Sequence, residues 1–180
     1  MNTEKILDYY CGIERLKQTR RKGWEIHRVP NVESVADHVF GVMSLSLLFA
    51  AKRKMNIADV LVIGLIHEVC EIALGDITPH DGVSESDKQK AEESAARSFL
   101  EKIDPTGHYF ELWMDFEHQR TPEGKLVKNV DRLEMVCQAF VYENRHDMRL
   151  DEFYEYVKKR VNDPELIAHV ASVIEHREKK

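Results

Sequence analysis

Residues 60–76 read VLVIGLIHEVCEIALGD, a continuous apolar run that ends in a group of ionisable side chains. His67, Glu68 and Glu71 directly follow the aliphatic part of this run, and Asp76 closes it. Burying an imidazole and two carboxylates beside aliphatic side chains costs several kcal/mol unless hydrogen bonds or a metal ion compensate them. The segment therefore predicts either a buried polar network or a metal site.

The same segment predicts a helix over residues 57–74, with Asn56 as its N-cap and Gly75 at its end. On a helix, His67 and Glu71 share one face because they are four residues apart. Glu68 is turned about 100° from His67 and still neighbours Glu71. We expect all three side chains to line one pocket.

The remainder of the chain predicts an all-α fold. Only eight glycines and five prolines interrupt its 180 residues, and apolar residues recur at spacings of three and four in nearly every stretch. We expect one domain over residues 1–180, with residues 23–30 extended or looped. Caps at Ser34, Ser84, Thr121 and Asp163, together with the periodicity, predict helices over about residues 4–19, 35–54, 57–74, 85–103, 107–119, 122–143, 151–160 and 164–178.

Composition limits the cellular setting and the partners. A net charge of −6, spread along the chain, disfavours a protein that grips nucleic acid polymers. Three distant cysteines, with no CxxC pair, favour reduced thiols over disulfides or a thiolate zinc site. The first residues have no signal-peptide core, and no stretch reaches the ~20 apolar residues that span a bilayer. We expect a cytoplasmic protein without a membrane partner.

Two further ionisable residues stand in apolar helical stretches. His38 lies in ESVADHVFGVM, and Asp131 lies in KLVKNVDRLEM. Taken alone, each is more often a hydrogen-bonded core residue than a ligand. Together with His67 and Glu68, however, they offer nitrogen and oxygen ligands from separate helices of a bundle. Such a set suits one divalent manganese, cobalt, iron or zinc ion.

The order His38, His67-Glu68, Asp131 resembles the H…HD…D pattern of the HD-domain metal-dependent phosphohydrolases, with Glu68 in the place of the family's aspartate. The segments GWEIHRVPNVESVADH, IHEVCEIALGDITP and KLVKNVDRLEM are similar to the 5′-deoxynucleotidase branch, which includes YfbR-type and HDDC2-like proteins. This resemblance covers about residues 5–145. It implies a single HD-type helical bundle with added C-terminal helices at about 151–178, and a homodimer.

The resemblance also implies an activity, the release of phosphate from deoxyribonucleoside 5′-monophosphates, with one divalent metal ion per chain. The implied metal ligands are His38, His67, Glu68 and Asp131. Glu71 and Asp76 correspond to the family's further acidic residues, so we expect Glu71 to transfer a proton and Asp76 to orient the 3′-hydroxyl or the water.

Trp24 corresponds to the family's tryptophan near the sugar. In the YfbR-type proteins an arginine immediately precedes that tryptophan, whereas Gly23 stands there in this chain. We therefore expect Arg20, Arg21 or Arg28 to bind the phosphate.

Three other interpretations stay open at this point. The HExxE string resembles the HExxH motif of zinc peptidases, but position 71 lacks the second histidine. A cyclic-nucleotide or alarmone hydrolase would need additional histidine ligands, for which His80 and His118 are available. Because Glu68 departs from the family pattern, a degenerate domain that binds nucleotide without turnover is the third.

Overall fold

The computed structural model describes residues 2–78 and 81–179, and these form helices and connecting turns with no strand. The predicted all-α fold is confirmed. The helices are α1 (Thr3–Gln18), α2 (Lys22–Ile26), α3 (Val35–Arg53), α4 (Ile57–Ile66), α5 (Glu71–Leu74), α6 (Glu85–Ile103), α7 (His108–His118), α8 (Pro122–His146), α9 (Asp151–Lys158) and α10 (Pro164–Glu178).

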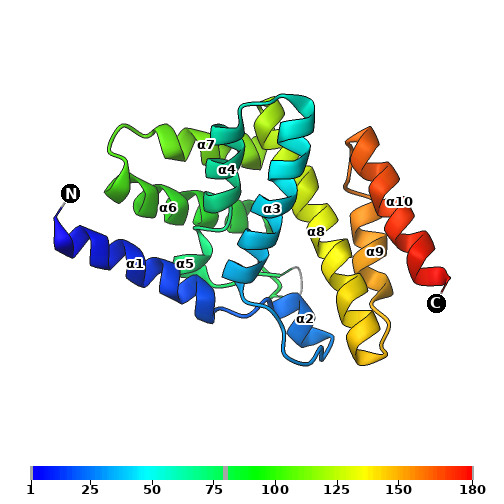
Figure 1. Ribbon diagram of the computed structural model, residues 1–180. Coiled ribbons are helices and arrows are strands. Elements are labelled where there is room, and N and C mark those ends of the chain that lie inside the picture. Colours follow the sequence, from blue (N-terminus) through cyan, green and yellow to red (C-terminus); the bar gives the residue numbers. More distant parts are fainter. Residues whose placement is uncertain (1, 79–80, 180) are drawn as a thin grey trace.

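The centre of the molecule is formed by α3, α4 and α8, which contact one another pairwise. Figure 1 shows α9 and α10 against one side of α8, and α1, α5, α6 and α7 on the other side of the molecule. Gly124 allows the tight contact between α7 and the start of α8, because an added Cβ would lie 2.3 Å from the Asp115 carbonyl oxygen. Ionisable side chains on α3 and α8, and at the end of α4, can therefore come together near the middle of the bundle.

Most helices begin where the sequence predicts. Ser34 forms a capping box with Asp37, so that α3 starts at Val35 and places His38 in its first turn. Asn56 accepts hydrogen bonds from the backbone N–H groups of Ala58 and Asp59, and Asp163 caps α10 in the same way. These caps each satisfy backbone donors that have no partner inside the helix.

Residues 22–26 differ from the prediction of an extended or looped segment, because they form the short helix α2. Trp24 is buried within it and anchors it against the core. A five-residue helix makes little periodic signal, so tertiary contacts of the tryptophan decide its conformation. Residues 27–30 lie outside the helix, as expected.

The helix predicted over residues 57–74 is broken, with α4 ending at Ile66 and α5 beginning at Glu71. Two backbone carbonyls at the break are taken by side chains. The His67 ring donates to the Gly64 carbonyl at 2.7 Å, and Trp113 of α7 donates its indole N–H to the His67 carbonyl at 3.2 Å. The Glu71 N–H donates to the Glu68 carbonyl at 3.1 Å and not to the His67 carbonyl four residues back. This bond over three residues makes the turn tighter than that of an α-helix.

The C-terminal helices pack within the chain. Leu166 and Val170 of α10 are buried in the common core, and Arg177 forms two hydrogen bonds with Glu143 of α8, at 2.6 and 2.8 Å. Glu143 also accepts from the Leu150 N–H and the Tyr154 hydroxyl. Leu166 and Val170 therefore serve intramolecular packing, whereas Ile167 of α10 is exposed. The Glu143 carboxylate joins α8, α9 and α10.

α3 is, by length and composition alone, apolar enough to cross a membrane, contrary to the expectation that no stretch has this property. Its contacts with α1, α4 and α8 place one face inside the bundle, and His38 on that face is fully buried. Its outer face carries the exposed apolar side chains of Phe40, Leu47 and Leu48.

Candidate metal centre and active site

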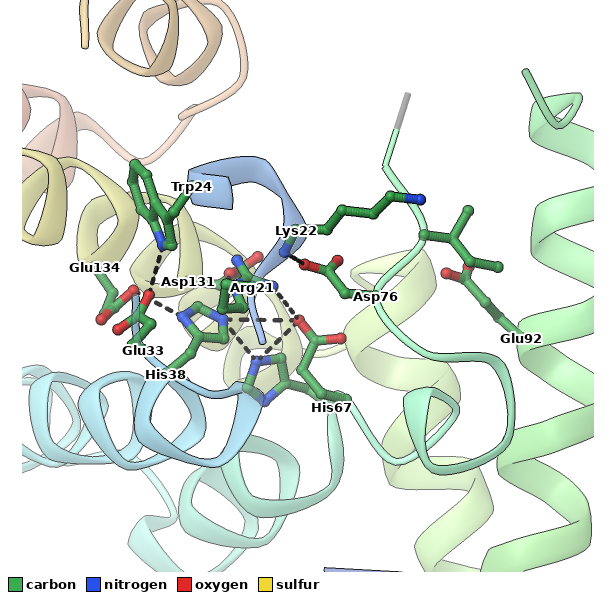
Figure 2. Close-up of polar contacts among 12 residues, drawn as sticks. Arg21, Lys22, Trp24, Glu33, His38, His67, Asp76, Glu92, Asp131 and Glu134 are labelled. Carbon is green, nitrogen blue, oxygen red and sulfur yellow. Dashed lines mark hydrogen bonds and ion pairs between the residues drawn. The ribbon is translucent and has the colours of Figure 1, made fainter. Parts of the chain in front are cut away.

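Four side chains from three parts of the bundle meet at one point. The ligand atoms of His38, His67, Glu68 and Asp131 all lie within 4.8 Å of one another. His38 Nε2 is 3.4 Å from His67 Nε2 and 3.2 Å from Asp131 Oδ1 (Figure 2). Glu68 Oε1 lies 3.7 Å from each imidazole Nε2. Two histidine nitrogens and two carboxylate oxygens that face one another at these separations form a donor set for one divalent cation.

Hydrogen bonds on the far side of each ring orient both imidazoles toward the cluster. His67 uses Nδ1–H for the Gly64 carbonyl, and His38 Nδ1 lies 2.7 Å from Glu134 Oε2 of α8. The Nε2 atom of each ring is thereby turned to the common centre. A carboxylate or carbonyl partner of this kind holds the tautomer and the ring orientation that metal binding requires.

The charge states of the ligand side chains suit a cation. Burial lowers the pKa of His67, so its ring is neutral at physiological pH. Burial opposes ionisation of Asp131, but the hydrogen bond from His38 and the charges of His38, His67 and Lys128 together outweigh it and lower the pKa of the carboxyl group. Burial also opposes ionisation of Glu68, and the positive charge of Arg21 is among the interactions that lower its pKa.

His38 carries a proton in the absence of a bound cation. Burial and Arg21 disfavour the imidazolium form, but Glu134 and Asp131 outweigh them and raise the pKa of His38 to about 10. Because a histidine ligand must be neutral at the coordinating nitrogen, metal binding displaces this proton.

Two further carboxylates, those of Glu134 and Glu33, lie on the side of His38 that faces away from His67 (Figure 2). Glu134 holds His38, while Glu33 accepts the indole N–H of Trp24 at 2.8 Å. Gly41, one turn after His38, leaves the space for Glu134, since an added Cβ would lie 2.8 Å from its Oε1. Burial, with the negative charge of Glu134, raises the pKa of Glu33 to about 7. Figure 2 shows these two acids beside His38, on the side away from His67.

Of the three arginines predicted to bind phosphate, only Arg21 reaches the site. Its guanidinium lies 3.5 Å from Glu68 Oε1, and it lines the cavity beside the cluster. Arg20 donates instead to the Val32 carbonyl at 2.8 Å, and Arg28 is exposed with a positive φ of 58°. Neither of these two side chains lines the cavity.

Glu71 and Asp76 both line the cavity near the ligands. Burial, followed by the charges of Glu68 and Asp76, raises the pKa of Glu71 to about 10. Within the described residues, Glu71 Oε2 is buried without a hydrogen-bond partner. Asp76 follows Gly75, whose φ of 70° turns the chain, and its carboxylate accepts the Lys22 N–H at 2.6 Å. Because its pKa is raised in this way, the carboxyl group of Glu71 stays protonated at neutral pH.

The cavity has a volume of about 540 Å³ and runs from the cluster to α9. This is within the range of small-molecule sites. Trp24 contributes to its wall although its side chain is buried, because Phe153 of α9 stacks on the indole with centroids 4.0 Å apart. Of the other predicted site residues, all but the fully buried His38 line this cavity, and Arg20 and Arg28 lie outside it.

The sequence analysis missed the acid that holds His38 and several residues of the cavity wall. Glu134 follows Asp131 by three residues, a spacing that places both on one helix face, so helical periodicity could have indicated it. Phe153, Tyr156 and Arg160 come from the C-terminal part of the chain and line the cavity through tertiary packing. His118 is exposed at the end of α7, and His80 lies outside the described residues.

The peptidase interpretation requires Glu68 to act as a general base outside the ligand set. The Glu68 carboxylate instead faces both imidazoles, and Glu71 occupies the position of the missing histidine. Two histidines and two carboxylates thus meet beside one cavity. The fold and the site together define an all-helical protein with a candidate metal site of mixed nitrogen and oxygen donors.

Residues 13–167 match the HD domain family, so the chain belongs to that family. It is 31% identical to the 5′-deoxynucleotidase HDDC2 of Xenopus laevis, over 97% of this chain and 88% of the relative. It is also 31% identical to the 5′-deoxynucleotidase hdd1 of Schizosaccharomyces pombe, over 99% and 94%. The crystal structure of the PH0347 protein from Pyrococcus horikoshii OT3 superimposes with a TM-score of 0.74 at 30% identity, covering 99% of both chains.

Proposed function

We propose that this protein is a metal-dependent phosphomonoesterase that hydrolyses deoxyribonucleoside 5′-monophosphates to deoxynucleosides and phosphate. The observation that carries the proposal is the convergence of His38, His67, Glu68 and Asp131 beside a cavity of nucleotide size. The relatives named 5′-deoxynucleotidase, which align over nearly the whole chain, support the choice of substrate.

The four converging side chains would hold one divalent ion, and their mixed donors favour manganese or cobalt, with iron or zinc as further candidates. When bound, such an ion supplies Lewis-acid chemistry, polarising a phosphoryl oxygen and lowering the pKa of water. Glu134 keeps His38 aligned for this role. The fit of the donor set rests on neutral His67 and ionised Asp131 at physiological pH.

Arg21 binds the phosphate in this proposal. Of the three candidate arginines, Arg21 is the one whose guanidinium lies beside the cluster, 3.5 Å from Glu68. A guanidinium presents paired N–H donors that match phosphate oxygens. Its ion pair with Glu68 holds it beside the metal ligands until a substrate phosphate competes for its donors.

Glu71 and Asp76 divide the proton and orientation roles. A carboxyl group that is protonated at neutral pH can donate to the leaving 5′-oxygen, and Glu71 has this property. Asp76, anchored by the Lys22 N–H, orients the 3′-hydroxyl or the attacking water. Trp24 forms a rigid wall near C2′, where a ribose 2′-hydroxyl would clash or lose its hydration.

We also propose that the protein is a cytoplasmic homodimer. The exposed residues Phe40, Leu47 and Leu48 follow helical spacing along the outer face of α3, which favours a second copy as its partner. The three free cysteines suit a reducing compartment. The C-terminal helix α10 is less suited to this role, because its apolar residues Leu166 and Val170 are buried in their own chain.

The test is phosphate release from a panel of deoxyribo- and ribonucleoside 5′-monophosphates, each with manganese, cobalt, iron or zinc. We expect turnover of the deoxyribonucleotides and a much lower rate with ribonucleotides. Absence of phosphate with every nucleotide and metal would contradict the enzyme assignment and leave a nucleotide-binding domain. Equal rates for the two sugars would contradict only the role of Trp24.

A further inference from the structure

The outer end of the cavity is built by α9, a helix beyond the part of the chain that carries the metal ligands. Phe153 and Tyr156 are three residues apart and therefore share one face of α9, and both line the cavity. Tyr154 and Val157, on the neighbouring face, are buried in the core and fix the rotation of the helix.

Two contacts connect α9 and the turn after it to residues that are close in sequence to members of the metal cluster. Trp24, close in sequence to Arg21, stacks on Phe153 at an interplanar angle of 26°. On the other side, Arg132 follows the ligand Asp131 and donates to the Arg160 carbonyl. The aromatic residues of α9 thus lie next to the groups assigned to the sugar and to the phosphate.

Tyr156 is held at the rim by a cation. The Arg160 guanidinium lies 3.8 Å from the centroid of the Tyr156 ring, a stacked cation–π geometry, and 37% of Tyr156 is exposed. Across the cavity, α6 contributes the polar side chains of Lys88, Gln89 and Glu92. Among the described wall residues, flat apolar surface near the rim therefore comes from α9.

We propose that Phe153 and Tyr156 form the nucleobase-binding wall of the active site; this inference rests on the proposed nucleotidase function. A nucleotide bound with its phosphate at the metal cluster and its sugar at Trp24 extends its base toward α9. Every base has an aromatic face, so stacking there supplies affinity with little discrimination among bases. Helix α9 is accordingly part of the active site as well as of the fold.

The experiment compares a deoxyribonucleoside 5′-monophosphate with 2-deoxyribose 5-phosphate, which has the same phosphate and sugar but no base. The variants are Tyr156→Ala, Phe153→Leu, which keeps apolar volume, and the conservative Tyr156→Phe. Glu155→Ala is the matched control, because Glu155 is on α9, outside the cavity wall, and pairs with Lys158 at 2.6 Å.

We expect Tyr156→Ala and Phe153→Leu to lower kcat/KM for the nucleotide roughly ten- to a hundredfold, mainly through KM, as loss of a base-stacking ring predicts. The baseless substrate should be unaffected, Tyr156→Phe should lose less than Tyr156→Ala because it keeps the aromatic ring, and Glu155→Ala should resemble the wild type. Equal losses with both substrates would overturn the proposal and make α9 a structural element. Unchanged kinetics with the nucleotide would overturn it as well.

Direct binding separates this proposal from the proposed function. If the wild type hydrolyses neither compound, calorimetric titration with the deoxynucleotide and with the baseless phosphate still tests the wall. Tighter binding of the nucleotide that is lost in Tyr156→Ala supports it. Equal affinity for the two ligands in the wild type would overturn it.

Discussion

Glu68 carries one methylene more than the aspartate of the HD pattern, and it lies in the turn between α4 and α5. From there its carboxylate lies 3.7 Å from both imidazole Nε2 atoms and 3.5 Å from Arg21. The longer side chain is therefore compatible with the four-residue cluster.

Replacing Glu68 tests its role as a ligand. We expect Glu68→Ala to lower manganese affinity beyond the roughly 10- to 100-fold that loss of a ligand's hydrogen-bond partner costs, and to abolish phosphate release. Glu68→Asp should keep both properties. Calorimetric manganese titration measures the affinity, and normal binding by the alanine variant would place Glu68 outside the ligand set.

Glu134 contacts the proposed ligand His38 and is not itself one of the four proposed metal ligands. We expect Glu134→Ala to weaken metal binding roughly 10- to 100-fold by freeing the His38 ring. Glu33→Gln is the matched control, since it removes a neighbouring acid and leaves the 2.7 Å contact of Glu134 with His38 in place. Chelator competition measures both, and equal losses would indicate a general charge effect.

At the scale of the helices, the joint of α8, α9 and α10 is a buried ion pair. The side chains of Glu143 and Arg177 are 7% and 8% exposed, so removing Glu143 leaves the buried Arg177 guanidinium with the exposed Asp151 as its remaining ion-pair partner among the described residues. We expect Glu143→Gln to lower the free energy of unfolding by ~3 kcal/mol, the lower end of the range for a buried pair. Urea unfolding measures this, and Glu175→Gln on the exposed face of α10 should stay within ~0.5 kcal/mol of wild type.

The same pair has a defined pH dependence. Burial opposes ionisation of Glu143, but the hydrogen bonds from Arg177, the Leu150 N–H and the Tyr154 hydroxyl, with the charge of Arg177, together outweigh it and lower the pKa of Glu143 below the ordinary value of 4.5. A carboxylate with a lowered folded-state pKa contributes its full stability above the unfolded value. The difference between wild type and Glu143→Gln should therefore be constant above about pH 4.5 and shrink as the pH falls through the folded-state pKa. A difference that grows on acidification would contradict this account.

Local signals predicted the helix starts well, and long-range contacts explain what they missed. Ser34, Asn56 and Asp163 each cap the helix that the sequence assigns to them, because capping involves only neighbouring residues. The break before Glu71 depends on Trp113, which is 46 residues from the carbonyl it binds. The position of α9 in the cavity wall likewise depends on Trp24 and Arg132, which no local pattern reveals.

At the scale of the whole molecule, the outer face of α3 is the feature that assembly would cover. We expect the wild type to be a dimer and the double variant Phe40→Glu/Leu48→Glu to be a monomer, since each unpaired carboxylate buried in an interface costs about 3–5 kcal/mol. Sedimentation velocity measures the mass. Leu7→Glu is the control, because Leu7 is 58% exposed on α1 and lies off the α3 face. A monomeric wild type would contradict the proposed assembly.

The break between α4 and α5 has a consequence for anyone who wishes to transplant this site. His67 is at once a metal ligand and the residue whose ring takes the Gly64 carbonyl, so the ligand helps to make the bend that presents Glu68 and Glu71. A straight helix would keep His67 and Glu71 on one face, but it would lose the turn that sets the Glu68 carboxylate 3.7 Å from His67 Nε2. A working graft would have to carry Trp113 as well, because its indole holds the bend from the neighbouring helix.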